Sequence, residues 1–131
     1  MKKTPLLNTS LSEVIASLGH GDLLVIADAG LPIPPQTRRI DLALTQGVPG
    51  FVETLQVVLQ EMRVESVIVA QETGQVSPHI LTAIQDLLPG TPVKTVTHEA
   101  LKQMTKEARA VVRTGEFTPY ANVVLISGVV F

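Results

Sequence analysis

The sequence predicts a three-layer α/β/α single domain with a mostly parallel central sheet, covering residues 1–131. Short apolar runs, typical of strands covered on both faces, alternate with segments whose apolar residues recur at helical spacing. Such alternation favours parallel strands with helices on both faces of the sheet. A chain of 131 residues with 45% hydrophobic residues can bury one core, and two domains are not expected.

The first predicted element is an amphipathic helix that begins at Ser10 and ends at His20. Ser10 and Glu13 resemble a capping box, and the glycine before His20 is a common helix stop. A continuous apolar run over residues 23–27 then predicts a strand buried on both faces. Asp28 follows at once and should lie at the carboxyl end of that strand.

The middle of the chain repeats this pattern. Alternating apolar residues predict a strand over residues 40–44, and helical spacing predicts a helix over residues 51–62. A short buried strand is expected over residues 67–70. Ser77 then suits a helix N-cap, followed by proline in the first turn of a helix over residues 78–88.

The last third predicts three strands and one short helix. Residues 93–96 form a strand, Thr97 caps a helix that runs through residue 104, and residues 110–114 and 123–126 form two further strands. The final pair is either antiparallel or joined by a crossover. No internal repeat or low-complexity linker interrupts the chain.

The loop Arg113–Asn122 (RTGEFTPYAN) concentrates scarce side chains. Three of the chain's four aromatic residues, Phe117, Tyr120 and Phe131, lie in this loop or just beyond it. Ligands of α/β sheets bind outside the carboxyl ends of the strands, where this loop starts and Asp28 lies. The loop is therefore interpreted as a small-molecule site, against the alternative of a turn that packs Tyr120 into the core.

Composition and motifs exclude several classes of function. The net charge is −2 without a basic cluster, so neither nucleic acid nor a membrane surface is an expected partner. No signal peptide or membrane-length apolar run occurs, which predicts a soluble, cytoplasmic protein. The absence of cysteine, of metal-binding spacings and of phosphate-binding loops indicates that no metal or other cofactor is required. General acid–base chemistry by imidazoles and carboxylates remains.

Two of the three histidines are candidates for this chemistry. His20 follows a predicted helix C-terminus, where the helix dipole favours positive charge, and His98 lies at a predicted helix N-terminus, where it does not. We hypothesise that His20 donates a proton and that His98 is a mostly neutral hydrogen-bonding partner. The alternatives are a helix C-cap for His20 and an ordinary helix-start residue for His98. His79 is interpreted as a surface residue.

Three further side chains suit a polyol ligand. The two oxygens of Asp28 can accept from adjacent sugar hydroxyls, although the same carboxylate can equally cap the turn before Gly30. Tyr120 offers an apolar face and a hydroxyl, while Asn122 offers an acceptor and two donors. The apolar residues 129–131 end the chain without a polar tail and are expected to be buried between subunits.

Four segments together resemble the D-ribose pyranase family, the ribose-mutarotase relatives of fucose mutarotase. They are NTSLSEVIASLGHGD, VIADAGLPIP, the THE triplet at 97–99 and RTGEFTPYANVVLISGVVF, and they occur in the family's order over nearly the whole chain. The resemblance implies interconversion of β-D-ribopyranose and β-D-ribofuranose, which feeds a downstream ribokinase in ribose catabolism. It also implies homo-oligomers, commonly ring-shaped homodecamers, with sites at subunit clefts.

By this resemblance His20 matches the family's proton donor, and Asp28, His98 and the Tyr120–Ala121–Asn122 segment match its D-ribose-binding positions. The oligomer size is the weaker transfer. One alternative is mutarotation of another sugar, such as fucose. The others are a non-catalytic ribose-binding accessory module and a bare structural subunit.

Overall fold

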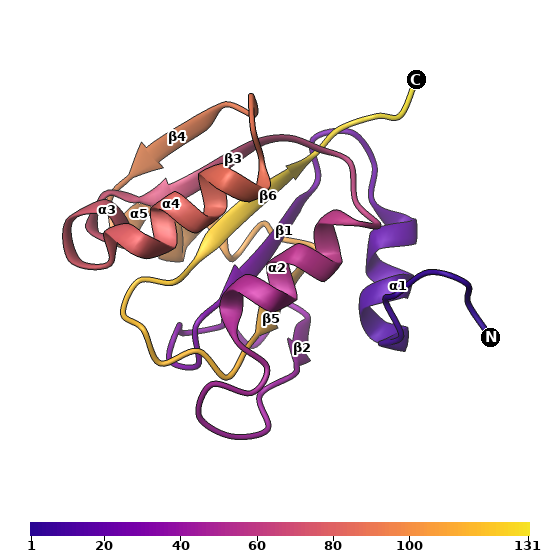
Figure 1. Ribbon diagram of the computed structural model, residues 1–131, viewed down its shortest axis with the longest axis horizontal. Coiled ribbons are helices and arrows are strands. Elements are labelled where there is room, and N and C mark those ends of the chain that lie inside the picture. Colours follow the sequence, from indigo (N-terminus) through magenta and orange to yellow (C-terminus); the bar gives the residue numbers. More distant parts are fainter.

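One mixed sheet of six strands forms the centre of the molecule, and the structure, a computed structural model, describes residues 1–131 (Figure 1). The helices are α1 (Thr9–Ser17), α2 (Phe51–Leu59), α3 (Gln71–Val76), α4 (Pro78–Leu87) and α5 (His98–Met104). The strands are β1 (Leu23–Ala27), β2 (Arg39–Asp41), β3 (Val64–Ala70), β4 (Val93–Val96), β5 (Ala110–Arg113) and β6 (Val123–Ser127). No helix is long and apolar enough to cross a membrane.

The strand order across the sheet is β2-β5-β1-β6-β3-β4. Three pairs of neighbouring strands are parallel: β2 with β5, β5 with β1, and β3 with β4. Only β6 runs against the others, because it pairs antiparallel with β1 on one side and with β3 on the other. The predicted α/β fold with a mostly parallel sheet is therefore confirmed. The last two strands are antiparallel in direction, with β1 between them.

Helices cover the two faces of the sheet unequally. Helices α1, α2 and α4 pack on one face, where 19 buried residues form the larger core, and Figure 1 shows α2 and α4 in front of the strands. The other face carries α5 and the chain around Leu31, which enclose a smaller core of 7 buried residues. Strands β1, β5 and β6 are buried almost throughout, as their continuous apolar runs predict.

The first helix differs from its prediction at both ends. Its N-cap is Asn8, whose Oδ1 accepts from the Leu11 N–H at 2.9 Å, so the predicted capping box at Ser10 is wrong. The cap lies two residues earlier because Asn8 offers the same kind of side-chain oxygen. The helix ends at Ser17, since Leu18 already has extended backbone angles. His20 thus lies in the turn beyond the helix.

Two other elements depart from the predictions. Strand β2 ends at Asp41 rather than at residue 44, because the Asp41 carboxylate accepts from the Ala43 N–H at 3.1 Å and turns the chain. Helix α3, directly after β3, was not predicted. It has no apolar periodicity, and Thr73 is its only buried residue. The remaining helices and strands lie where expected, within a few residues at their ends.

The topology gives the sheet two functionally different edges. The five parallel strands all end at one edge, which we call the carboxyl edge, and the loop that precedes antiparallel β6 reaches the same edge. The opposite edge, which we call the amino edge, holds the starts of β1 and β3 and the end of β6. Every candidate site residue can be assigned to one of these two edges.

Candidate functional site

A buried amide and a carboxylate are paired at the centre of the carboxyl edge. Asn122 is fully buried just before β6, and Asp28 follows β1. The Asn122 Oδ1 accepts from the Asp28 N–H at 2.9 Å, and the Asn122 Nδ2 donates to the Asp28 Oδ2 at 3.0 Å. The other carboxylate oxygen accepts from the Gly30 N–H at 2.9 Å. Each oxygen keeps a lone pair, so the turn role and a ligand role of Asp28 are compatible.

Tyr120 lies next to this pair in an unusual backbone conformation. Its φ of 61° is in the left-handed region, and no other residue except glycine has a positive φ. The Asn122 N–H donates to the Tyr120 carbonyl at 2.9 Å, which closes a tight turn around the buried Ala121. Tyr120 is half-buried and does not belong to the buried core, so the alternative of a turn that packs it into the core is wrong.

The Tyr120 ring stacks edge-on against His98. Their ring centroids are 4.9 Å apart at an interplanar angle of 81°. His98 is the first residue of α5, as predicted, and the Thr97 Oγ1 caps that helix by accepting from the Ala100 N–H at 3.1 Å. The His98 Nδ1 is buried and has no hydrogen-bond partner. Next to the Asp28–Asn122 pair there is therefore a pair of half-buried rings, in which the His98 Nδ1 has no protein partner.

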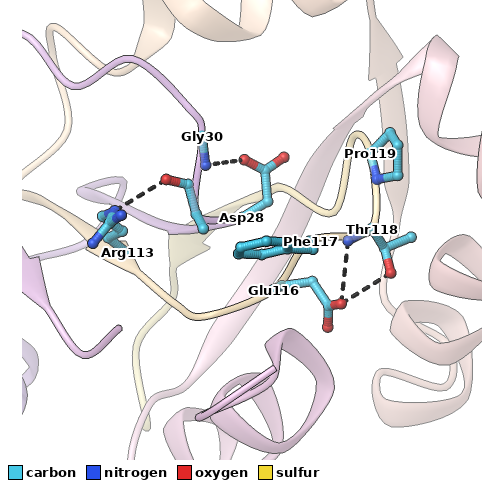
Figure 2. A pocket seen from close by; sticks show the side chains of 8 residues that line it. Asp28, Gly30, Arg113, Glu116, Phe117, Thr118 and Pro119 are labelled. Carbon is cyan, nitrogen blue, oxygen red and sulfur yellow. Dashed lines mark hydrogen bonds between the residues drawn. The ribbon is translucent and has the colours of Figure 1, made fainter. Parts of the chain in front are cut away.

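A pocket of about 400 Å³ opens beside Asp28 (Figure 2). The loop between β5 and β6 supplies half of its lining residues, and the exposed Phe117 ring lies between the Asp28 and Glu116 side chains in this view. On the opposite wall, the Arg113 Nε donates to the Ala29 carbonyl at 3.0 Å. This pocket does not include Tyr120, His98 or Asn122, so we place the site on the hydrogen-bonded cluster and treat the pocket as its open side.

Glu116 fixes the loop that lines the pocket. Its Oε1 accepts from the Phe51 N–H at the start of α2 at 3.1 Å, and its Oε2 accepts from the Thr118 hydroxyl at 2.9 Å. Burial, the largest single influence on the pKa of Glu116, raises it. The hydrogen bonds from Phe51, Thr118 and Phe117 together outweigh burial and hold the pKa below its ordinary value of 4.5.

His20 lies at the amino edge, away from the other candidates. It precedes β1 whereas Asp28 follows it, and at about 3.3 Å per strand residue the two are separated by roughly 20 Å. The His20 Nε2 is 2.6 Å from the Glu65 Oε2 at the start of β3, and both side chains are more than half exposed. The C-cap alternative is wrong, because the partner of the ring is this carboxylate.

His20 borders a hollow whose lining is partly apolar. The imidazole lines a hollow of about 500 Å³ together with Leu18 and the C-terminal residues Val129–Phe131. Val130 and Phe131 are 87% and 101% exposed, so the chain ends in an uncovered apolar segment. Large exposed apolar patches mark interaction surfaces in soluble proteins.

The structure thus groups the predicted site residues in two places. Asp28, His98, Tyr120 and Asn122 come together at the carboxyl edge with Ala121 between the last two, and His20 stands alone at the other edge. His79 is exposed, as expected. No group of three or more histidine, aspartate or glutamate side chains is arranged to hold a metal ion.

Sequence reasoning missed the residues that hold the site in place. Three side chains from distant elements contact candidate residues, and a fourth contacts Pro119 next to Tyr120. None belongs to a motif: Glu65, Glu72, Thr73 and Ser77. Ser77 was interpreted as a helix cap, yet its hydroxyl donates to the Pro119 carbonyl instead. These contacts span 26 to 47 residues in sequence, so no local pattern could indicate them.

Comparison with known proteins identifies the family. Residues 1–130 match the model of the RbsD / FucU transport protein family. The chain belongs to this family. The D-ribose pyranase of Chloroflexus aggregans is 64% identical over 131 residues, and that of Clostridium perfringens is 55% identical, in both cases with full coverage of both chains.

Two solved structures extend the comparison. The structure of Bacillus subtilis RbsD complexed with D-ribose matches with a TM-score of 0.97 at 46% identity, covering all of both chains. The fucose mutarotase of Streptococcus pneumoniae in complex with L-fucose matches with a TM-score of 0.85 at 26% identity, again over the full length of both. The likeness to the ribose-binding relative is therefore closer in both sequence and fold.

Proposed function

We propose that this protein is a D-ribose pyranase, an isomerase that interconverts β-D-ribopyranose and β-D-ribofuranose. The observation that carries the proposal is full-length identity of 64% to a D-ribose pyranase. Its fold also superposes on that of a relative complexed with D-ribose. In the cell, the furanose would be consumed by a kinase specific for that ring form, and we place the protein in the cytoplasm with it.

The reaction needs only proton transfers. A proton is delivered to the ring oxygen at C5 as its bond to C1 breaks, while the anomeric hydroxyl loses a proton and becomes the aldehyde. Closure then reverses these transfers, with the C4 hydroxyl attacking C1 to form the five-membered ring. A well-placed acid or base typically accelerates such a step by about 10² to 10⁴.

We assign the roles from position and chemistry. His20 is exposed and is held by Glu65, and an imidazole can both donate and accept a proton, which suits a proton donor. The carboxylate of Asp28 keeps acceptor capacity for sugar hydroxyls, and Tyr120 offers a half-buried ring and a hydroxyl. His98 supports the Tyr120 ring from its edge and contributes a polar ring to the same wall.

His20 lies too far from the Asp28–Asn122 cluster for both to act on one ribose within a single protomer, which supports a role for a second subunit. No movement within one protomer brings the two edges of its sheet together, because rigid β1 lies between them. We propose that His20 of one protomer completes the carboxyl-edge site of its neighbour in a homo-oligomer, with a decamer as the expected size. The exposed tail Val129–Phe131 next to His20 supplies an apolar surface for that contact.

Exchange NMR on D-ribose tests the reaction and the substrate together. Saturating the β-pyranose anomeric signal should reduce the β-furanose signal faster when protein is added. His20→Ala should abolish the acceleration while D-ribose binding persists, and His79→Ala, at an exposed histidine outside the site, should behave as the wild type. An exchange rate that the wild-type protein leaves unchanged would overturn the enzyme proposal in favour of a non-catalytic ribose-binding module.

The second candidate function is mutarotation of L-fucose, and the same assay with that sugar tests it. Its support is the fold shared with a fucose mutarotase at a TM-score of 0.85. Faster exchange of fucose anomers than of ribose ring forms would replace D-ribose as the substrate while leaving the chemistry unchanged.

A further inference from the structure

We propose that Thr73 and Ser77 are positioning residues whose buried hydroxyls fix the backbone of Tyr120 and thereby set the affinity of the site for D-ribose. The inference rests on the proposed function. It concerns α3 and the following Ser77, a segment that has no role in the proposed function so far.

The conformation of Tyr120 needs external support. A residue with a side chain at φ 61° has its Cβ close to its own backbone carbonyl, so the left-handed conformation is disfavoured unless surrounding contacts impose it. Such outliers are concentrated at functional sites. A glycine would adopt the same backbone without cost, yet the chain keeps a tyrosine there.

Two hydroxyls supply that support. The Thr73 Oγ1 donates to the Tyr120 carbonyl at 2.8 Å, and the Ser77 Oγ donates to the preceding carbonyl, that of Pro119, at 2.7 Å. The Tyr120 carbonyl also accepts from the Asn122 N–H at 2.9 Å. Consecutive peptide groups on either side of the left-handed residue are thus fixed, so the direction in which the tyrosine side chain leaves the backbone is fixed as well.

Burial makes these hydrogen bonds hard to replace. Thr73 is 0% exposed and Ser77 is 1% exposed, so water does not reach their hydroxyls. Removing a hydroxyl would leave a carbonyl of the loop without this partner, and the loop would relax toward ordinary backbone angles.

Ser77 gives up an ordinary structural role to make its contact. It occupies the N-cap position of α4, where a serine oxygen usually accepts a helix N–H, but it makes no side-chain cap bond. Its hydroxyl points to the loop instead. The Ser77 hydroxyl therefore contributes a hydrogen bond to the loop in place of one to α4.

The same segment also reaches His98, the aromatic partner of Tyr120. The Glu72 Oε2 accepts from the His98 N–H at 2.6 Å, which ties the start of α5 to α3. Both rings of the stacked pair are therefore located by adjacent residues of one short helix. A displacement of α3 would move the two rings together.

The test compares Thr73→Val with Thr73→Ser in the D-ribose exchange assay. Valine keeps the shape and removes the donor, so the apparent KM should rise about 10-fold while kcat changes much less, as expected for one lost buried hydrogen bond. Serine keeps the donor and should restore most of the affinity. In a Tyr120→Gly background, Thr73→Val should have little further effect on KM, because no side chain remains to be positioned.

Thr105→Val is the matched control. Thr105 is equally buried, and its hydroxyl donates to the Lys102 carbonyl at the end of α5, outside the site. Both Thr105→Val and Thr73→Val should lower the melting temperature, because each removes a buried hydrogen bond. Only Thr73→Val should raise KM, and Thr105→Val should keep the wild-type KM. A wild-type KM for folded Thr73→Val would overturn the inference; if that variant does not fold, Ser77→Ala decides by the same criterion. Failure of wild-type protein to accelerate exchange would instead refute the proposed function.

Discussion

Asn122 performs two tasks with one amide group. Its oxygen accepts from the Asp28 N–H, and its nitrogen donates to the Asp28 carboxylate, so backbone and side chain of the same residue are fixed together. The amide supplies an acceptor and a donor from one planar group and carries no charge. The pair therefore sets the position of the carboxylate that we expect to bind sugar hydroxyls.

Asn122→Asp should destabilise the protein at neutral pH. The change replaces the donor with a second carboxylate in a fully buried position, 3.0 Å from the first, and should cost about 2–4 kcal/mol of the free energy of unfolding. Protonation of either carboxyl group at low pH relieves the repulsion, so the loss should be greater at pH 7 than at pH 4. Urea unfolding followed by circular dichroism at both pH values measures it.

Asn8→Asp is the control for this substitution. Asn8 uses only its oxygen, which accepts from the Leu11 N–H at a helix N-cap, and aspartate caps helices equally well. Its stability should stay close to that of the wild type. An equal loss of stability relative to the wild type at both pH values would show that the two side chains are not coupled.

For individual residues, the sequence predicted part of the candidate site from the type of side chain and its place next to a strand. Asp28, Tyr120 and Asn122 were predictable because they carry hydrogen-bonding groups next to apolar runs that form strands. Thr73 was not, because its partner lies 47 residues away and threonine occurs in many roles. The position of His20 apart from Asp28 was implicit in the sequence, since a whole strand separates them.

Among the elements, the loop between β5 and β6 is joined to α2 by Glu116. The carboxylate lies at the helix N-terminus, where the helix dipole and the free Phe51 N–H favour its charged form. Its lowered pKa means that the folded state binds this proton less readily than the unfolded chain does. The resulting stabilisation is complete above pH 4.5 and is lost as the pH falls through the lower folded pKa.

Glu116→Gln should therefore lower the free energy of unfolding by about 1 kcal/mol at pH 7, the usual size of a capping contribution. The difference from the wild type should shrink below pH 4.5 and be small at pH 3. Glu13→Gln, at an exposed carboxylate paired with Arg38, is the control and should change little at either pH. A difference that stays constant from pH 7 to pH 3 would contradict the assigned cause.

Element prediction succeeded where burial produces a repeated pattern. The central strands β1, β5 and β6 and the amphipathic helices α2 and α4 have such patterns over several residues. Helix α3 has none, because it is fixed by hydrogen bonds from single side chains rather than by an apolar face. Side-chain turns such as that of Asp41 also end strands at points that periodicity does not show.

In the whole molecule, the two groups of site residues should belong to complementary edges of different protomers. His20→Ala and Asp28→Ala should each be inactive alone, because each lacks one half of the site. In oligomers assembled at random from equal amounts of the two variants, half of the protomers have an intact His20 and the other half have an intact Asp28. A site that takes His20 from one protomer and Asp28 from its neighbour is then complete in one case of four, so the mixture should recover about a quarter of the wild-type exchange rate.

Refolding the two variants together before the exchange assay measures this recovery. The reference is a mixture of each variant with Asn8→Asp protein, which retains both His20 and Asp28. It measures how much activity refolding and subunit mixing preserve. Activity that remains absent in the refolded mixture of the two variants would place His20 and Asp28 in the same protomer's site or remove one of them from the reaction.

The antiparallel direction of β6 has a consequence for how copies can associate. This strand begins at the turn that we propose binds the sugar, at one edge of the sheet, and leads to the apolar tail at the other edge. The two surfaces that we propose to contact each other between protomers therefore lie at opposite ends of one protomer. Contacts of that kind are head-to-tail, and they make closed rings when successive rotations add up to a full circle and open filaments when they do not. If the proposed contact between tail and turn forms, the angle at which the tail leaves β6 would set the number of protomers, and an open assembly would leave its outermost copies without a complete site.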